Sequence, residues 1–247
     1  MKNRKTLKKA GLILAGVLVA LILLCGWYIM DYYHVADRDE AMSDTGLVTV
    51  TVTDNGYFYD GPGEDTALIF YPGAKVEDIA YAKLLKEVAA QGVDCFLVHM
   101  PCNFAFLGMN RADEVMENNH YQHWYLAGHS LGGAMAADYA AENTQKLDGL
   151  ILLGAYPTKD LSKSALKVLS VYGSEDLVVN RDKIESGRAL VPQSYYTEYC
   201  IEGGNHAQYG DYGEQKGDGT ATISAEEQRK ITTEQVMAFI LADLQKN

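Results

Sequence analysis

Short apolar runs and longer amphipathic stretches alternate along most of the chain. Residues 47–53 alternate apolar and polar side chains, a period typical of a half-buried strand. A turn sequence at 54–56 and an aromatic run at 57–59 predict a second strand. Later apolar runs cover residues 67–71, 93–99, 124–127, 149–153, 166–172 and 195–201, and helix-like stretches cover 77–90, 131–143, 180–190 and 224–244.

This alternation of short strands with helices predicts an α/β fold. Repeated strand–helix–strand units favour a doubly wound, mostly parallel sheet that is covered on both faces. Residues 47–247 have the length of one such domain. Only residues 155–164 separate the run at 149–153 from the next, so we expect no cap domain over the sheet.

The N-terminal apolar segment differs from all the others. Residues 10–30 contain no charged side chain, and a helix of that length spans about 32 Å, against about 30 Å for a bilayer core. We expect a transmembrane anchor at 10–30, a basic cytoplasmic tail at 1–9 and a polar stalk at 31–46. The positive-inside rule then puts the remainder outside the cytoplasm. A cleaved signal peptide, or lipidation at Cys25, is the alternative.

Charge is distributed unevenly along the chain. The formal net charge is −12, but residues 1–30 hold five cations and no acid. Residues 31–247 therefore carry 16 cations against 33 acids, a net charge of −17. A surface this acidic repels polyphosphate, so we expect no nucleic-acid partner.

A candidate nucleophile lies where a strand-like run meets a helix-like one. The sequence Gly128-His129-Ser130-Leu131-Gly132 has the form G-x-S-x-G between an apolar run and a good helix start. In that context the turn is tight, and side chains at Gly128 and Gly132 would collide with neighbouring backbone. The turn holds the Ser130 hydroxyl at the carboxyl end of the sheet, above a helix N-terminus that favours an oxyanion.

A serine hydroxyl needs a base to take its proton, and that base needs an orienting acid. In G-x-S-x-G enzymes the acid and then the histidine follow the serine. Of the six histidines only His206 does so, in a loop after the run at 195–201. The candidate acid is Asp176, just past the run at 166–172, with Glu175 and then Asp148 as alternatives.

An oxyanion hole requires two backbone N–H donors. One is expected from Leu131, the residue after the serine, and the other from the loop after the run at 67–71. Pro72 has no N–H, so the second donor is Gly73 or Ala74, with Ala74 favoured.

Apolar residues after the run at 93–99 are candidates for an acyl pocket. An equal alternative is that they pack under the helix expected from about residue 110. These candidate substrate-binding residues are Phe104, Phe106, Leu107 and Met109.

Residues 47–245 resemble the α/β-hydrolase superfamily, most closely the small lidless bacterial members related to dienelactone hydrolases. The resemblance implies an eight-stranded type of sheet and a serine hydrolase with Ser130, Asp176 and His206 as its triad, without a metal or other cofactor. Dienelactone hydrolases use a cysteine nucleophile, so lactone chemistry is not implied. The matching residues are 71–76, 110–113, 128–133, 173–176 and 204–207.

Two functions follow as hypotheses. The first is a membrane-anchored extracytoplasmic esterase that cleaves a small-molecule, lipid or envelope ester through an acyl-enzyme. The second is a noncatalytic hydrolase-fold module that binds an envelope component through the same cleft. The presence of all three triad residue types in the expected order favours the first hypothesis.

Overall fold

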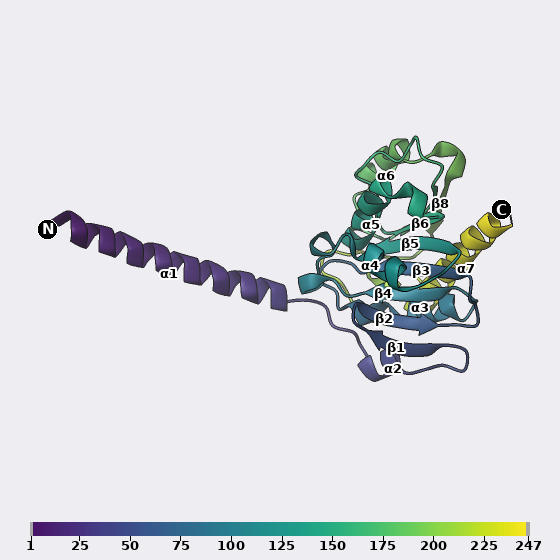
Figure 1. Cartoon of the computed structure of the whole chain (residues 1–247), viewed down its shortest axis with the longest axis horizontal. Coiled ribbons are helices and arrows are strands. Elements are labelled where there is room, and N and C mark those ends of the chain that lie inside the picture. Colours follow the sequence, from purple (N-terminus) through teal and green to yellow (C-terminus); the bar gives the residue numbers. More distant parts are fainter. Residues whose placement is uncertain (1, 246–247) are drawn as a thin grey trace. The chain divides into compact units, whose positions relative to one another are not determined.

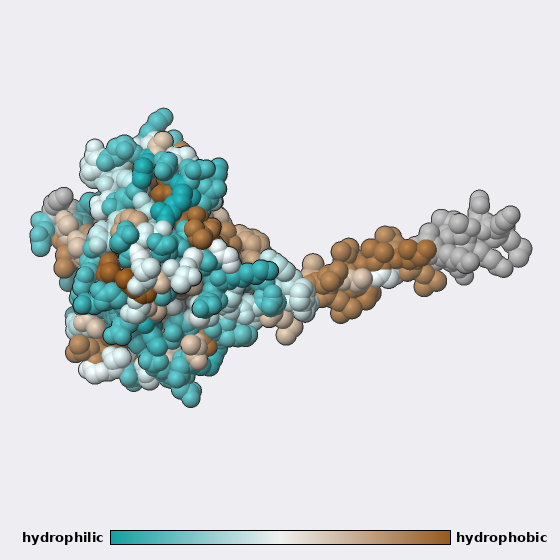
Figure 2. All heavy atoms as spheres, turned by 180° about the vertical axis from the view of Figure 1, so that it is seen from behind, coloured by the Kyte–Doolittle hydropathy of each residue, from teal (hydrophilic) through white to brown (hydrophobic). Residues whose placement is uncertain are grey.

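The computed structural model describes residues 2–245, without the side chains of residues 2–10, and divides the chain into two units. The first unit, up to Tyr32, is one helix, α1 (Lys2–Met30). Its stretch Gly11–Met30 is long and apolar enough to cross a membrane, and none of it is buried. In Figure 2 hydrophobic residues predominate over the coloured part of this helix. Such a helix near the N-terminus fits a membrane anchor or a signal sequence.

The second unit, from Tyr33 onward, is built on an eight-stranded sheet with the strand order β1-β2-β4-β3-β5-β6-β7-β8 (Figure 1). Strands β3 to β8 run parallel to one another, whereas β2 is antiparallel to both β1 and β4. The strands are β1 (Thr49–Thr53), β2 (Gly56–Asp60), β3 (Thr66–Tyr71), β4 (Asp94–Val98), β5 (His123–His129), β6 (Gly149–Leu153), β7 (Lys167–Gly173) and β8 (Tyr196–Ile201).

Helices cover both faces of the sheet, because successive strand residues point to opposite faces. Leu68 and Phe70 pack in the core that includes α3 and α7, whereas Ala67 and Ile69 pack in the core that includes α4 and α5. The α-helices of this unit are α2 (Arg38–Met42), α3 (Ala82–Ala89), α4 (Arg111–Asn118), α5 (Leu131–Glu142), α6 (Arg181–Gly187) and α7 (Ala225–Leu244). Short 3₁₀ turns are η1 (Asp78–Tyr81), η2 (Pro101–Asn103), η3 (Ala105–Leu107), η4 (Thr144–Lys146), η5 (Arg188–Leu190), η6 (Gln193–Tyr195) and η7 (Ala207–Tyr209).

The prediction of a doubly wound, mostly parallel sheet is confirmed. Each strand-like run in the sequence corresponds to a strand of the structure, and the turn at 54–56 joins β1 to β2 in a hairpin. Between β6 and β7 the structure has no helix or strand, so this connection carries no cap.

The segment at 33–46, expected as part of a stalk, instead packs on the globular unit. Tyr33 forms a parallel bridge with Val76, and residues 38–42 form helix α2, whose Ala41 is buried. Asp37 caps α2 through its side chain, which accepts a hydrogen bond from the Glu40 amide. Polar composition suggested a solvated segment, but these few contacts are enough to dock it.

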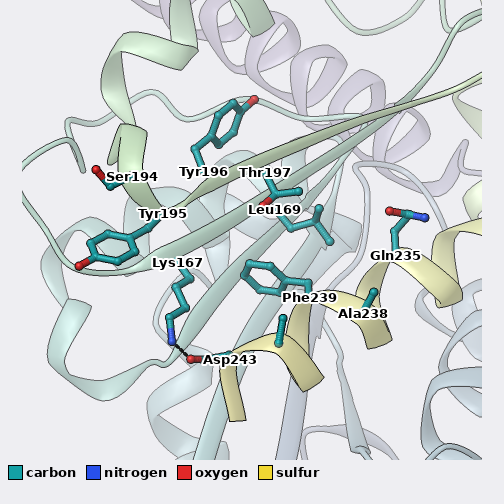
Figure 3. A pocket seen from close by; sticks show the side chains of 11 residues that line it. Lys167, Leu169, Ser194, Tyr195, Tyr196, Thr197, Gln235, Ala238, Phe239 and Asp243 are labelled. Carbon is teal, nitrogen blue, oxygen red and sulfur yellow. Dashed lines mark ion pairs between the residues drawn. The ribbon is translucent and has the colours of Figure 1, made fainter. Parts of the chain in front are cut away.

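An ion pair with a buried carboxylate fastens the C-terminal helix α7 to the amino ends of the strands. Asp243, which is 2% exposed, accepts a 2.7 Å hydrogen bond from the Tyr125 hydroxyl and pairs with Lys167 of β7. Beside this pair, β7, β8 and α7 enclose a cavity of about 290 Å³ (Figure 3). The cavity lies at the strands' amino ends, away from the loops that carry the candidate triad.

Replacing Asp243 by alanine is expected to destabilise the globular unit. The substitution removes the buried partner of the Lys167 ammonium and the Tyr125 hydroxyl. A buried hydroxyl left unsatisfied costs about 1–3 kcal/mol, whereas the Lys167 side chain is 23% exposed and keeps part of its hydration. Urea unfolding measures the loss. Leu241→Ala, an exposed position on the same helix, is the control and should change the unfolding free energy by no more than about 0.5 kcal/mol. An equal loss of unfolding free energy in Asp243→Ala and Leu241→Ala would contradict a stabilising role for the Asp243 contacts.

Candidate active site

Ser130 occupies a sharp turn between strand β5 and helix α5. Its backbone angles are φ 54° and ψ −124°, a conformation that a residue with a side chain rarely adopts. Such a conformation costs about 1–3 kcal/mol and persists only where the surroundings enforce it. A 2.9 Å hydrogen bond from the Ser130 amide to the Leu153 carbonyl of β6 helps to hold it.

Close backbone packing around the turn explains the glycines at 128 and 132. A Cβ atom at Gly132 would lie 2.2 Å from the Tyr71 carbonyl oxygen, and one at Gly128 would lie 2.5 Å from the Gly132 carbonyl carbon. The expected collisions are therefore present. They also put the first turn of α5 directly against the loop that follows β3.

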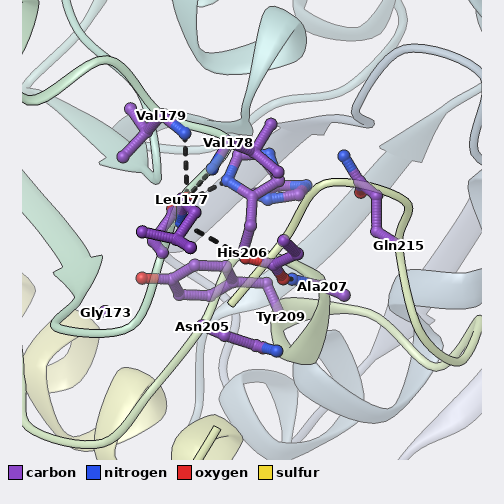
Figure 4. A network of polar contacts seen from close by, with 12 residues as sticks. Gly173, Leu177, Val178, Val179, Asn205, His206, Ala207, Tyr209 and Gln215 are labelled. Atoms are coloured by element: carbon purple, nitrogen blue, oxygen red, sulfur yellow. Dashed lines mark hydrogen bonds and ion pairs between the residues drawn. The ribbon is translucent and has the colours of Figure 1, made fainter. Parts of the chain in front are cut away.

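Asp176 and His206 form a buried hydrogen-bonded pair. Asp176 follows β7, His206 follows β8, and each is 1% exposed. The Asp176 Oδ2 to His206 Nδ1 distance is 2.7 Å, and Asp176 Oδ1 accepts bonds of 2.9 and 2.8 Å from the amides of Val178 and Val179 (Figure 4). All of these contacts fix the carboxylate and hold one ring nitrogen of His206 toward it.

Ser130 and His206 line the same pocket, of about 220 Å³, and His206 Nε2 has no hydrogen-bond partner among the described residues. The structure therefore brings the candidate base to the candidate nucleophile's pocket without a formed hydrogen bond between them. Hydrogen bonds of this kind are often long before substrate binds. The other lining residues are Leu131, Ala134, Gly154, Ala155, Tyr156, Val178, Val179 and Asn180.

The two alternative acids lie elsewhere. Asp148 immediately precedes β6, and its carboxylate accepts a 2.9 Å hydrogen bond from the Trp124 amide. The Glu175 carboxylate accepts a hydrogen bond from the Ser174 hydroxyl. Neither is bonded to His206, whereas Asp176 is.

The loop after β3 contains both candidates for the second oxyanion donor, and their hydrogen bonding distinguishes them. The Gly73 amide donates a 3.1 Å hydrogen bond to the Tyr81 hydroxyl, so it is already engaged. The Ala74 amide has no hydrogen-bond partner in the part of the chain that the structure describes. Leu131 is the first residue of α5, where backbone amides have no partner within the helix.

Two buried side chains that the sequence analysis did not single out connect this loop to His206. The Tyr81 hydroxyl accepts a hydrogen bond from the Gly73 amide and lies 2.7 Å from His129 Nδ1. The His129 ring lies 4.4 Å from the His206 ring, centroid to centroid. Burial, and then the neighbouring His206, hold the pKa of His129 well below its usual value. His129 is therefore neutral, and we assign the Tyr81 O–H as donor to its Nδ1.

The expected acyl-pocket residues do not line the pocket that holds Ser130 and His206. Met109 packs against the core on the α5 face, while Phe106 and Leu107 are more than half exposed on η3. The Phe104 ring packs against the Phe106 ring in a tilted arrangement, with ring centroids 5.3 Å apart. The reason is the strand order, because β6 and β7 lie beside β5 on the other side from β3 and β4 and supply the pocket wall.

The sequence does contain signals for the residues that form the wall of the Ser130 pocket. Val178 and Val179 directly follow the candidate acid, and Gly154 to Tyr156 follow an apolar run. Gly154 has a φ of 51°, and a Cβ there would lie 3.0 Å from His206 Nδ1 and 3.1 Å from Asp176 Oδ2. It therefore makes room for the acid–histidine pair. Nothing comparable in the sequence marks Tyr81.

The chain belongs to the Alpha/beta hydrolase family, whose model matches residues 67–230. No curated protein matches the chain. Among the residues searched in the structure, no group of three or more His, Cys, Asp or Glu side chains is arranged to hold a metal ion. The fold and the family together define a hydrolase.

Solved structures share the fold at low sequence identity. A predicted CIB-like hydrolase from Thermoplasma acidophilum superimposes with a TM-score of 0.59 at 16% identity, covering 76% of this chain and 98% of that one. Est1E from Butyrivibrio proteoclasticus gives 0.57 at 16% identity, covering 81% and 100%. The monoacylglycerol lipase of Paleococcus ferrophilus gives 0.55 at 13% identity, covering 72% and 96%. At these identities the similarity establishes the fold.

Tyr81→Phe tests the connection through the buried phenol. The substitution keeps the ring but leaves the Gly73 amide and His129 Nδ1 without their partner. An unsatisfied buried polar group costs about 1–3 kcal/mol of unfolding free energy, which chemical denaturation measures. Tyr199→Phe, at a partly exposed ring, serves as the control and should change stability by no more than about 0.5 kcal/mol. If Tyr81→Phe leaves the unfolding free energy unchanged, the hydrogen bonds of the phenol do not contribute to stability.

The depressed pKa of His129 predicts a specific loss of stability in acid. An unfolded histidine titrates near pH 6.5, so below about that pH the unfolded state binds a proton that folded His129 rejects. Stability then falls with falling pH, by about 1.4 kcal/mol per unit for this group. Urea unfolding between pH 7 and 5.5 should show a shallower pH dependence in His129→Gln than in the natural chain. Parallel curves would contradict the prediction.

Proposed function

We propose that the protein is a serine hydrolase that cleaves an ester-type acyl bond, with Ser130 as nucleophile, His206 as general base and Asp176 as the orienting acid. The observation that carries the proposal is the buried 2.7 Å hydrogen bond that the Asp176 carboxylate accepts from His206 Nδ1. The other ring nitrogen of His206 is unpaired among the described residues and lies in the pocket that Ser130 also lines. A packing histidine has no need of a buried carboxylate on one side and a serine pocket on the other.

The proposed reaction begins with attack of Ser130 Oγ on the ester carbonyl carbon. His206 Nε2 takes the hydroxyl proton, and Asp176 stabilises the resulting imidazolium and keeps the ring oriented. Collapse of the tetrahedral intermediate breaks the carbon–oxygen bond, and His206 returns the proton to the departing alcohol. Water, deprotonated by His206, then attacks the acyl-serine and releases the carboxylic acid.

The oxyanion of the intermediate is bound by the amides of Leu131 and Ala74 in this proposal. Gly73 is the weaker candidate, because its amide already donates to Tyr81. The N-terminus of α5, which is 12 residues long, adds a favourable dipole at the same place. A single donor of this kind is typically worth about 10²–10³ in rate.

The substrate end that enters the pocket is proposed to be uncharged. Apart from His206 the pocket is lined by small, aliphatic, tyrosine and asparagine side chains, with no cation to bind a carboxylate or phosphate. The proposed nucleophile is a serine, so the lactone chemistry of the cysteine-dependent dienelactone hydrolases is not carried over. A small-molecule, lipid or envelope ester fits these requirements, and the acidic surface argues against nucleic acid.

We further propose that α1 is an uncleaved membrane anchor with the catalytic unit outside the cytoplasm. The five basic residues precede the apolar stretch and acidic residues follow it, which is the distribution that the positive-inside rule associates with a cytoplasmic N-terminus. Protease accessibility of the globular unit in intact cells and in inverted vesicles tests this topology directly.

Labelling with a fluorophosphonate tests the proposed chemistry. The full-length chain should be modified at Ser130, and Ser130→Ala should not be modified. Asp176→Asn should be labelled far more slowly, because the equivalent change in a Ser-His-Asp enzyme lowers the rate by about 10⁴ through the wrong histidine tautomer.

Ser164→Ala is the matched control, since Ser164 lies in the β6–β7 connection outside the pocket, and it should be labelled like the natural chain. Labelling that persists in Ser130→Ala, or that is missing from the folded natural chain, would refute the proposed triad. The second of these outcomes would instead favour a noncatalytic binding module.

A further inference from the structure

The polypeptide enters the globular unit at the edge of the sheet that carries the candidate site. Tyr33, the first residue of this unit, forms a parallel bridge with Val76. The Tyr33 amide donates a 2.7 Å hydrogen bond to the Lys75 carbonyl, and its own carbonyl accepts a 2.8 Å bond from the Glu77 amide. The proposed oxyanion donor Ala74 is therefore the immediate neighbour of a residue that holds the entry point.

Further contacts make this entry point rigid. The Val35 amide donates to the Glu77 carboxylate at 2.9 Å, and the Ala36 amide donates to the Asp211 carbonyl at 2.8 Å. The Tyr33 ring lies 5.6 Å from the Tyr212 ring, which lies 6.4 Å from the Tyr81 ring. The Tyr81 ring in turn contacts His129, so packed rings run from the entry point to His206.

The candidate membrane span ends only three residues before Tyr33. Gly11–Met30 has the length of a bilayer core, so its end at Met30 belongs at the boundary of the hydrocarbon. Three Cα-to-Cα steps reach at most about 11 Å, and a headgroup layer is about 5–8 Å thick. Tyr33 can therefore lie no more than a few ångströms beyond the headgroups. Trp27 and Tyr28 supply the aromatic residues typical of that interface.

The same edge of the sheet exposes two pairs of large apolar side chains. Phe106 and Leu107, on η3 after β4, are 55% and 52% exposed. Leu177 and Val178, after β7, are 71% and 37% exposed, and Val178 also lines the Ser130 pocket. Strands β4 and β7 lie on opposite sides of β5 in the sheet, so the two pairs flank the loop that holds Ser130.

From the short tether and this apolar rim we propose that the carboxyl edge of the sheet rests on the membrane surface and takes its substrate from the bilayer. The substrate class is an uncharged acyl ester of a membrane amphiphile. The proposal rests on the proposed hydrolase function and anchor, and adds to them where the site works. The two apolar pairs enter the interfacial layer, and the pocket opens among them.

The first test lengthens the tether. About 16 Gly and Ser residues, inserted between Asp31 and Tyr32 of the full-length chain, extend on average about 20–24 Å and free the edge from the surface. The protein is reconstituted in phosphatidylcholine vesicles and assayed on p-nitrophenyl acetate in water and on a fluorogenic diacylglycerol ester in the vesicles. Turnover of the soluble ester should stay within about twofold, and turnover of the vesicle ester should fall at least about fivefold as the effective concentration drops.

The second test measures depth in the membrane without using activity. In a Trp27→Phe background, Leu177→Trp and Phe106→Trp are each reconstituted in vesicles that contain phospholipids with brominated acyl chains. Both new tryptophans should be quenched by the bromine atoms. Tyr195→Trp is the matched control, because Tyr195 is 46% exposed but precedes β8 at the amino edge, and it should not be quenched.

The outcomes separate the two proposals. A natural chain that hydrolyses neither ester refutes the hydrolase function, whatever the quenching shows. A chain that hydrolyses the soluble ester, but whose tether insertion leaves the vesicle ester unaffected, overturns the membrane-facing site alone. Rim tryptophans that escape quenching, or that are quenched no more than Tyr195→Trp, overturn it as well, and this result does not depend on how well the insertion variant works.

Discussion

The site depends on the parallel direction of strands β3 to β8, because parallel strands end at one common edge. The loops after β3, β5, β7 and β8 carry Ala74, Ser130, Asp176 and His206, which are far apart in the sequence. The sheet brings these loops to one edge and lets hydrophobic burial elsewhere compensate the strained turn at Ser130. The chemistry proposed for the protein therefore draws on the stability of the whole sheet rather than on local contacts.

The buried network around His206 gives the site a second level of organisation. Asp176 fixes one nitrogen of the ring by a hydrogen bond, and the tilted ring of His129 packs against it. Because His129 is neutral, it brings no positive charge beside the imidazolium that the proposed mechanism forms at His206. Through Tyr81 the same network engages the Gly73 amide, so the loop of the proposed oxyanion hole and the candidate base share one set of buried contacts.

Periodicity was sufficient to predict the strands and the longer helices, because their burial follows directly from side-chain spacing. The positions of Ser130, Asp176 and His206 at one edge were also predictable from motif and order alone. The wall of the pocket was not, because it depends on which strands neighbour β5, and the residues after β6 and β7 that line it were not among the candidates. Docking of the segment at 33–46 was missed too, since it rests on a few specific contacts such as the Tyr33–Val76 bridge.

Asp176 is held by main-chain groups, so its orientation does not depend on the side chains that line the pocket. The carboxylate is held by the peptide groups of Val178 and Val179, while their side chains form part of the pocket wall. Any residue except proline offers the same peptide N–H. Natural variation at these two positions can therefore change the pocket lining while the hydrogen bonds to the Asp176 carboxylate are kept. Substrate preference in the proposed hydrolase can then change independently of the proposed triad.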